Sequence, residues 1–273
     1  MKTIIAEKPS VAREIARVVD ARKREEGYFT GNGYAVTWAF GHLVQLALPE
    51  AYDIKGFNRD ALPVIPDAFK LVARVEKTEK GSKPDSGVLK QIDIIRRLFE
   101  ESERIIVATD AGREGELIFR HLYQYIDCHT PFDRLWISSL TDKAIREGLN
   151  NLRNGADYDN LYLAARARSE ADWLVGINGT QALSLAAGRG TYSVGRVQTP
   201  TLAMVCARYW ENRRFTPEAF WQLHLAVKDE GEDVVKFTSE EKWKDGDTAN
   251  SLYKRIKETC REVRITQVER KQK

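Results

Sequence analysis

The fold of this chain is decided by the stretch Ala108-Thr109-Asp110-Ala111-Gly112-Arg113-Glu114-Gly115-Glu116-Leu117. It follows the apolar run Arg104-Ile105-Ile106-Val107 and precedes apolar residues at helical spacing, among them Ile118 and Leu122. This order predicts a strand, a loop and a helix, with the acidic residues at the carboxyl edge of the strand. Open α/β sheets bind their ligands at this edge, and clustered carboxylates there indicate a site for a divalent metal ion.

A second strand is predicted near the amino terminus, where Thr3-Ile4-Ile5-Ala6 runs directly into Glu7 and Lys8. A Pro-Ser pair and a helical apolar pattern follow. If strands 3–6 and 104–109 are neighbours in a parallel sheet, their carboxyl ends lie at the same edge. We therefore expect Glu7, Asp110 and Glu114 to approach one cation.

The composition is that of a folded protein, since 42% of the 273 residues are apolar and 10% are aromatic. Three isolated cysteines, Cys128, Cys206 and Cys260, indicate neither a disulfide framework nor a zinc knuckle, and they fit a reducing cytoplasm. No apolar run approaches the roughly 18 residues of a membrane span, so we expect neither secretion nor membrane insertion.

Positive charge is distributed unevenly along the chain, although the net charge of +3 is small. Residues 153–214 contain eight arginines, five acidic residues and no lysine. The planar guanidinium group matches phosphate oxygens in pairs, so this segment indicates phosphate recognition. A solvated helix face with arginines covering apolar neighbours is the alternative.

Three regions differ in their patterns. Residues 1–152 alternate between strand and helix signals, which predicts a mostly parallel sheet with helices on both faces. The expected strands are 3–6, 34–40, 104–109 and 134–138, and the expected helices are 10–20, 87–100, 115–126 and 142–152. The polar stretch 77–86 is expected to be a mobile surface loop.

The other two regions are helical and then β-rich. Ala- and Leu-rich patterns predict helices at 158–186 and 198–213. Beyond residue 216, period-two alternation predicts strands at 221–227, 234–237 and 263–268, with a helix near 248–259. So few strands are only marginally stable alone, and we expect the chain to be part of a longer protein.

Four motifs occur in one order along the chain: Ala6-Glu7-Lys8-Pro9-Ser10, residues 38–43, residues 109–116, and Gly195-Arg196-Val197-Gln198-Thr199-Pro200-Thr201-Leu202. Together they resemble the amino-terminal part of type IA DNA topoisomerases, especially the bacterial topoisomerase III branch. The resemblance covers essentially the whole chain. It implies a Rossmann-like α/β Toprim domain at 1–152, part of a helical domain that binds single-stranded DNA at 153–215, and the start of a β-rich arch domain at 216–273.

The resemblance also implies an activity. In this family a tyrosine cuts single-stranded DNA and keeps the 5′-phosphate, a second strand passes, and the break is resealed without ATP, which relaxes or decatenates DNA. The tyrosine lies in a Tyr-Pro-Arg segment, and none of the ten tyrosines here is followed by Pro-Arg. The resemblance therefore implies an enzyme when complete, a monomer acting on DNA in the cytoplasm, and an inactive fragment in the present chain.

The resemblance assigns roles to the acidic and basic residues of the first two motifs. Glu7 matches a glutamate suited to shuttling a proton at the 3′-oxygen, and Lys8 matches a lysine that offsets charge on the scissile phosphate. The alternative for Lys8 is a solvent-facing residue before the turn at Pro9. His42, in the Gly-His-Leu turn, is expected to be structural.

Magnesium would be held by Glu7, Asp110 and Glu114, according to the resemblance. Gly112 stands where the family motif has its second aspartate, and Glu116 is expected to help from outside the ligand set. Mg²⁺ often uses one or two carboxylates with waters and a substrate phosphate, so the loss weakens metal affinity rather than excluding the metal. A helix cap is the alternative role for these acids.

The arginine segment contains the residues that the resemblance assigns to DNA. Arg168 lies one turn before Asp172, which could hold its guanidinium group toward DNA. The family's Ser-x-Gly-Arg-x-Gln region is matched by Ser193, Gly195, Arg196 and Gln198. Gly195 would allow close approach of a phosphate and Arg196 would bind it with two hydrogen bonds, unless this is a simple capping loop.

Two other functions fit part of the sequence. Another Toprim protein, such as a primase or nuclease, would share Glu7 and Asp110 but not the motif at 195–202. A noncatalytic single-strand binder would use the arginines of residues 153–214, and its degenerate acidic motif would explain Gly112.

Overall fold

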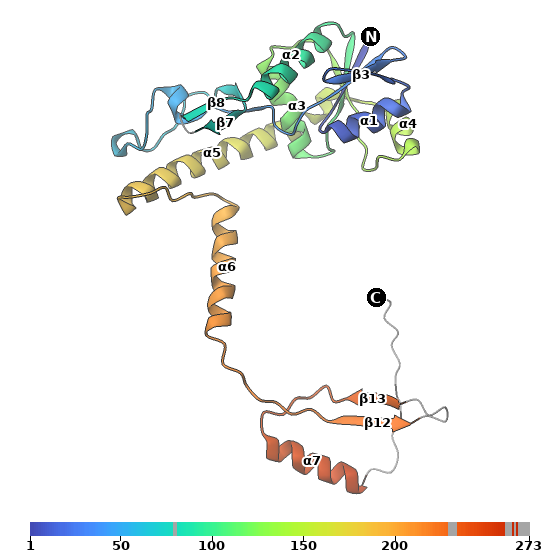
Figure 1. Cartoon of the computed structure of the whole chain (residues 1–273), viewed down its shortest axis with the longest axis vertical. Coiled ribbons are helices and arrows are strands. Elements are labelled where there is room, and N and C mark those ends of the chain that lie inside the picture. Colours follow the sequence, from blue (N-terminus) through green and yellow to red (C-terminus); the bar gives the residue numbers. More distant parts are fainter. Residues whose placement is uncertain (79–80, 229–233, 260–263, 265, 267–273) are drawn as a thin grey trace. The chain divides into compact units, whose positions relative to one another are not determined.

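The computed structural model describes residues 1–78, 81–228, 234–259, 264 and 266 (Figure 1). The chain divides into two compact units, Met1–Leu202 and Ala203–Lys273. The first unit contains every residue that was predicted for the metal and DNA sites. No helix among the described residues is long and apolar enough to cross a membrane.

A seven-stranded sheet with the order β11-β10-β9-β1-β4-β3-β2 forms the centre of the first unit. Its four middle strands are parallel, as predicted: β10 (Phe132–Arg134), β9 (Arg104–Ala108), β1 (Lys2–Ala6) and β4 (Tyr34–Trp38). The outer strands are antiparallel: β11 (Arg153–Asn154), β3 (Tyr28–Gly31) and β2 (Lys23–Glu25). Strands β1 and β9 are direct neighbours, which confirms the pairing expected from their sequences.

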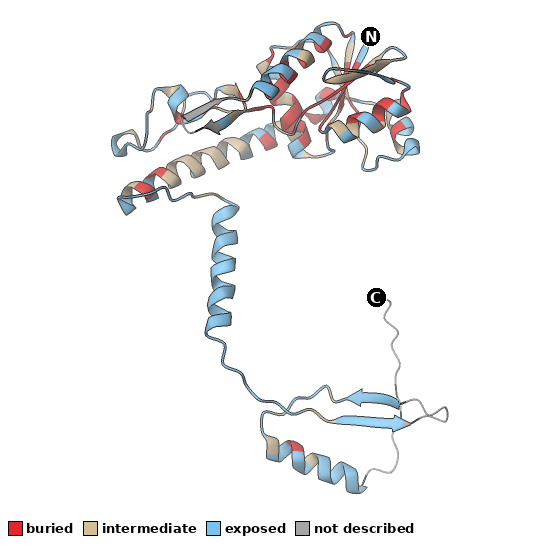
Figure 2. Cartoon of the chain, in the orientation of Figure 1, coloured by how far each residue is buried: buried red, intermediate tan, exposed pale blue. Residues whose placement is uncertain are grey.

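Helices cover both faces of this sheet, as the alternating pattern predicted. On one face α1 (Pro9–Val18) and α4 (Asp142–Asn150) pack against residues such as Ile4 and Ile106. On the other, α2 (Ser86–Glu100) and α3 (Arg113–Tyr125) pack against Ile5 and Ile105. Successive strand residues point to opposite faces, so a strand covered on both sides is apolar throughout. Figure 2 shows these buried residues gathered in the sheet and its helices.

Local signals set the helix starts. The Asp85 side chain accepts hydrogen bonds from the backbone of Gly87 and Val88 at the start of α2, and Thr141 caps α4 through the Ala144 nitrogen. Pro9 occupies the first turn of α1, where its missing N–H costs no helical hydrogen bond.

An insertion between β4 and α2 lies along the long helix α5 (Asp159–Ala187) (Figure 1). It contains β5 (Val44–Leu46), paired with β6 (Leu71–Ala73), and the short 3-10 helices η1 (Pro49–Tyr52) and η2 (Arg59–Ala61). Trp173 Nε1 donates to the Ala47 carbonyl at 2.9 Å, and the Asn178 amide bonds both backbone groups of Val64. These contacts attach α5 to the sheet domain.

Two sequence predictions in this unit are wrong. The polar stretch expected to be a loop contains the hairpin β7 (Val75–Thr78) and β8 (Gly81–Pro84). Main-chain hydrogen bonds can hold an antiparallel pair that has no apolar alternation, so the polar residues of this hairpin carry no strand signal. The strand expected at 134–138 ends at Arg134 instead. Trp136 leaves the sheet and stacks on Tyr158, with ring centroids 4.6 Å apart.

The remaining elements follow in chain order. The 3-10 helix η3 (Gly155–Tyr158) precedes α5, which ends at Gly188 with φ 73°. Helix α6 (Gln198–Arg213) was predicted within these bounds. In the second unit β12 (His224–Lys228) pairs with β13 (Val234–Thr238), and α7 (Gly246–Thr259) follows. Most of the strand predicted at 263–268 lies outside the described residues, and the domain limits at 152 and 215 stay predictions.

Candidate functional site

The candidate acidic site lies at the carboxyl edge of β1 and β9. Ala6 pairs with Ala108 in the parallel register, so Glu7 and Lys8 leave the sheet beside the loop that carries Asp110. The parallel arrangement thus brings together residues more than a hundred positions apart in sequence.

Glu7 and Lys8 form the inner part of this site. Glu7 is buried, with 8% of its surface exposed, and its Oε1 lies 3.2 Å from Lys8 Nζ. The hydrogen bond and negative charge of Glu7, together with the charge of Asp110, raise the pKa of Lys8. The Lys8 ammonium group therefore stays charged and partly neutralises both carboxylates.

Arg134 holds the main chain of the acidic loop through hydrogen bonds to its carbonyl groups. Its side chain is fully buried, and Nη1 donates to the carbonyls of Val107 and Thr109, each at 3.0 Å. Its Nη2 donates to the carbonyl of Asp110, also at 3.0 Å. Three main-chain carbonyls around Asp110 are therefore fixed by one guanidinium group.

Glu116 balances the charge of that buried arginine. Its Oε2 lies 2.8 Å from Arg134 Nε, and both side chains are fully buried. Arg120 Nε donates to its other oxygen at 2.9 Å. Burial lowers the pKa of Arg134, and Glu116 opposes this effect. Arg134 was not predicted from the sequence. The one feature that could have identified it is its position as a lone cation in the apolar stretch after residue 131.

Two glycines of the acidic motif have opposite surroundings. A Cβ atom on Gly115 would lie 2.1 Å from the Asp110 carbonyl oxygen, so α3 starts against the loop only because Gly115 has no side chain. Thr109 Oγ1 closes the same turn by donating to the Gly115 carbonyl at 2.8 Å. A Cβ atom on Gly112 would meet nothing within 4 Å. The position of the missing aspartate is therefore open space.

Glu114 forms a contact that the sequence did not predict. His42 Nε2 lies 2.6 Å from its Oε1, and a carboxylate can only accept, so the ring nitrogen donates. Glu114 is otherwise on the surface, with 71% of its side chain exposed. His42 was expected to be a structural histidine, and its ring has a hydrogen-bond partner 72 positions away in sequence.

The three predicted ligands do not form a ready-made metal site. Among the residues that the structure describes, no group of three or more His, Cys, Asp or Glu side chains is arranged to hold a metal ion. Glu7 and Asp110 both act on the Lys8 ammonium group, while Glu114 is engaged by His42. Two carboxylates with waters still suit Mg²⁺, a hard cation that keeps part of its hydration shell. Glu7 and Asp110 therefore fit a partly hydrated magnesium ion, and Glu114 as a third ligand stays a prediction.

The predicted DNA site joins helix α5 to the loop that precedes α6. Arg196 Nη2 donates to Asp172 Oδ2 at 3.1 Å, and Arg196 Nε bonds the other oxygen of the same carboxylate. The hydrogen bond from Arg196 lowers the pKa of Asp172, with smaller contributions from the charges of Arg196 and Arg168. Asp172 was expected to hold Arg168, and its hydrogen-bonded partner is instead Arg196.

Further hydrogen bonds hold the rest of that loop. The Val194 nitrogen donates to Thr180 Oγ1 at 2.9 Å, and the Gly195 nitrogen donates to Thr199 Oγ1 at 3.0 Å. Gln198 Nε2 donates to Ser193 Oγ at 2.6 Å. The structure thus brings together Asp172 of α5, Ser193, Gly195 and Arg196 of the loop that follows it, and Gln198 at the start of α6.

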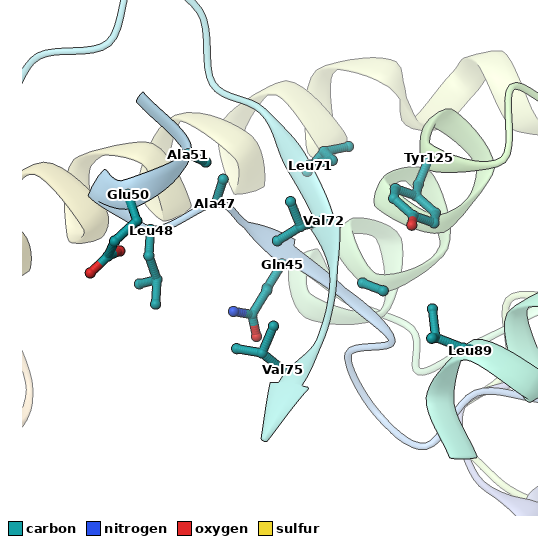
Figure 3. A pocket seen from close by; sticks show the side chains of 11 residues that line it. Gln45, Ala47, Leu48, Glu50, Ala51, Leu71, Val72, Val75, Leu89 and Tyr125 are labelled. Atoms are coloured by element: carbon teal, nitrogen blue, oxygen red, sulfur yellow. The ribbon is translucent and has the colours of Figure 1, made fainter. Parts of the chain in front are cut away.

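A separate apolar pocket of about 720 Å³ lies in the first unit, between the β5–β6 pair and helices α2 and α3 (Figure 3). Its lining includes Leu48, Leu71, Val72, Leu89 and Tyr125. It contains none of the predicted acidic or DNA-binding residues. The candidate chemistry therefore lies at the sheet edge and not in this pocket.

Comparisons with known proteins show what the two parts of the chain are similar to. A family model described as Toprim domain matches residues 2–140, and one described as DNA topoisomerase matches residues 156–273. "DNA topoisomerase 3" of Bacillus subtilis (strain 168) is 46% identical over 226 residues, which cover 82% of this chain and 30% of that protein. "DNA topoisomerase 3" of Bacillus thuringiensis (strain Al Hakam) is 44% identical over 247 residues, covering 87% and 32%.

A solved structure shows the same fold. It is the full-length topoisomerase I from Thermotoga maritima, with a TM-score of 0.55 and 24% identity over 92% of this chain and 37% of that chain. The chain spans about 30% of the length of the curated relatives that it matches. The Toprim match over half of the chain and the topoisomerase match after it show that this chain belongs to the type IA DNA topoisomerase family.

Proposed function

We propose that this chain supplies the acidic site and part of the single-strand grip of a type IA topoisomerase of the topoisomerase III kind. The complete enzyme cleaves and reseals single-stranded DNA through a 5′-phosphotyrosine link and relaxes or decatenates DNA without ATP. The observation that carries the proposal is the meeting of Glu7, Lys8 and the Asp110 loop at one edge of the sheet.

Glu7 and Lys8 are the proposed catalytic residues. The buried Glu7 carboxylate is placed to take a proton from, and return it to, the 3′-oxygen of the cut strand. The Lys8 ammonium group, kept charged by its neighbours, offsets negative charge on the scissile phosphate. Proteins of this family generally depend on Mg²⁺. When bound, the ion would add further positive charge beside that phosphate, held by Glu7 and Asp110, with Glu114 as a third ligand.

Single-stranded DNA is the proposed partner of the second site. Arg196 is held in a fixed orientation by Asp172 while 45% of its side chain stays exposed, so a phosphate can still reach it. The charge of Arg168 also acts on Asp172, and Arg189 lies in the same loop between α5 and α6 as Arg196. The hydrogen bonds of Ser193, Gly195 and Gln198 hold this loop for the phosphate contact. We expect a monomer that works on DNA in the cytoplasm.

One observation favours a second candidate, a noncatalytic single-strand binder. Gly112 has no side-chain oxygen that could bind a cation. The described residues hold no cluster of three His, Cys, Asp or Glu side chains arranged for a metal ion. Such a protein would bind DNA through the arginines of residues 153–214 without needing metal.

The experiment that tests the proposal uses the chain as it stands. It should bind a labelled single-stranded oligonucleotide in fluorescence anisotropy, more tightly than the matching duplex. It should not relax negatively supercoiled plasmid with Mg²⁺, because none of its tyrosines lies in a Tyr-Pro-Arg segment. Equal binding to duplex and single strand would contradict the proposed grip. Reproducible relaxation by the pure chain would mean that one of its own tyrosines is the nucleophile.

A further inference from the structure

The turn that carries His42 is fixed against the acidic site. The Ala39 nitrogen donates to the Ala6 carbonyl at 2.9 Å, and the Gly41 nitrogen donates to the Glu7 carbonyl at 3.4 Å. Gly41 has φ 72°, a backbone conformation that favours glycine. The turn is therefore attached directly to the main chain of β1 and Glu7.

Arg74 holds the same turn from the other side. Its Nη1 donates to the carbonyls of Phe40 and His42, each at 3.3 Å, and its Nη2 donates to Asp85 at 3.2 Å. Asp85 in turn caps helix α2. Bonds on both sides fix the backbone from which the His42 ring projects.

Glu114, in contrast, has few restraints of its own. It lies in the first turn of α3, and 71% of its side chain is exposed. An exposed glutamate on a helix samples several rotamers, and a single strong contact selects among them. The 2.6 Å hydrogen bond from His42 is such a contact. It occupies one of the two carboxylate oxygens of Glu114.

We propose that His42 is a positioning residue that withholds Glu114 from the cation site while no DNA is bound. This inference rests on the proposed magnesium site at Glu7 and Asp110. The carboxylate of Glu114 joins the cation only when it leaves His42, so the free chain binds metal through two carboxylates and more weakly. Because His42 lowers the metal affinity of the free chain, tight metal binding depends more strongly on a substrate phosphate. The phosphate supplies the missing oxygen ligand.

The test measures Mn²⁺ binding to the DNA-free chain at constant pH, by the electron paramagnetic resonance signal of free Mn²⁺. His42→Ala should bind Mn²⁺ about two- to fivefold more tightly, the range expected from releasing one exposed ionic contact. His42→Gln retains a donor for Glu114 and should return the affinity toward that of the wild type. A merely structural histidine would lower the melting temperature in both variants and leave the affinity unchanged or weaker.

Two controls separate this inference from the metal site itself. His129→Ala removes a histidine that also faces an acid, Asp127 at 3.6 Å, but beyond the other end of α3, and it should leave the affinity unchanged. Asp110→Asn should weaken Mn²⁺ binding if the metal site is correct. If Asp110→Asn weakens binding while His42→Ala equals the wild type or binds less tightly, the role of His42 is wrong and the metal site stands. If neither the wild type nor His42→Ala binds Mn²⁺ at about millimolar concentration, both ideas fail, and single-strand binding through Arg196 is unaffected.

Discussion

Arg196 and Asp172 lie 24 residues apart in sequence, and their side chains form a two-point ion pair that joins the loop before α6 to helix α5. The pair holds the guanidinium plane in one orientation while leaving part of its edge in solvent. An arginine prepared in this way loses less conformational entropy when it binds a phosphate than a free side chain does.

Arg196→Ala is therefore expected to weaken single-strand binding without changing sequence preference. Each phosphate contact on a single strand contributes about −0.7 to the slope of log K against log salt, so the slope should flatten by about that amount. Fluorescence anisotropy across a salt series measures it. Lys90→Ala, which removes a surface cation of α2 that pairs with Glu26, is the matched control. If Arg196→Ala binds the oligonucleotide like the wild type while Lys90→Ala binds it more weakly, the DNA contact lies elsewhere.

Alanine at the two glycines of the acidic motif should have opposite effects. Gly115→Ala forces a methyl group against the Asp110 backbone and is expected to cost about 3 kcal/mol or more. Gly112→Ala enters open space in an extended backbone, so its stability should stay within about 0.5 kcal/mol of the wild type. Urea unfolding of both variants decides the matter, and equal stabilities would show that α3 does not press against the loop.

Removal of Arg134 should be costly because it takes away one of the two arginine partners of the fully buried Glu116. Breaking a buried ion pair by removing one partner typically costs about 3–5 kcal/mol, whereas replacing both partners by apolar residues costs much less. The double variant Arg134→Met with Glu116→Leu is therefore expected to be more stable than Arg134→Met alone. Urea unfolding of the two proteins tests this order. The reverse order would mean that Glu116 still stabilises the core without Arg134, through its remaining partner Arg120.

His121 should make the first unit sensitive to mild acid. It is buried with Nδ1 unpaired, and burial, aided by the charges of His42 and Arg166, lowers its pKa from 6.5 to about 4. The unfolded chain takes up a proton below pH 6.5 and the folded chain does not. The contribution of His121 to the free energy of unfolding is therefore constant above about pH 7. It falls as the pH is lowered from about 6.5 to 4, by up to about 3 kcal/mol in total.

Urea unfolding at several pH values checks this expectation. His121→Gln should lose less stability than the wild type between pH 7 and pH 4.5, because it has no group that titrates in that range. His129→Gln, at an exposed histidine, should follow the wild type. Parallel curves for all three proteins would mean that His121 takes up its proton equally in the folded and the unfolded chain, so that burial does not lower its pKa.

Sequence reasoning predicted the parts of this structure that local patterns control. The apolar runs before Glu7 and Asp110 identified two buried parallel strands, and the shared sheet edge followed from them. The partners that fix the site come from distant segments. The contact of His42 with Glu114 and the support of Asp110 by Arg134 leave no periodic signal, because each joins two different elements.

The same limit explains the pairing of Asp172. Its spacing from Arg168 on one helix was visible in the sequence, and the interaction with Arg196 depends on how the following loop folds back. The hairpin of β7 and β8 was missed for another reason, since strand prediction relies on apolar alternation and this segment is polar.

The catalytic role of Glu7 in the complete enzyme can be measured with a chimera. In it, this chain replaces the matching region of Bacillus subtilis DNA topoisomerase 3, to which it is 46% identical. The measurement is relaxation of negatively supercoiled plasmid with Mg²⁺ and without ATP, for the chimera and its Glu7→Gln variant, which keeps the size of the side chain but not its charge. We predict that the chimera relaxes the plasmid and that the variant does so about 10²-fold more slowly or worse, which is the usual contribution of a general acid or base. Equal relaxation by both proteins would contradict the proposed role of Glu7, and no relaxation by either would favour a noncatalytic binder.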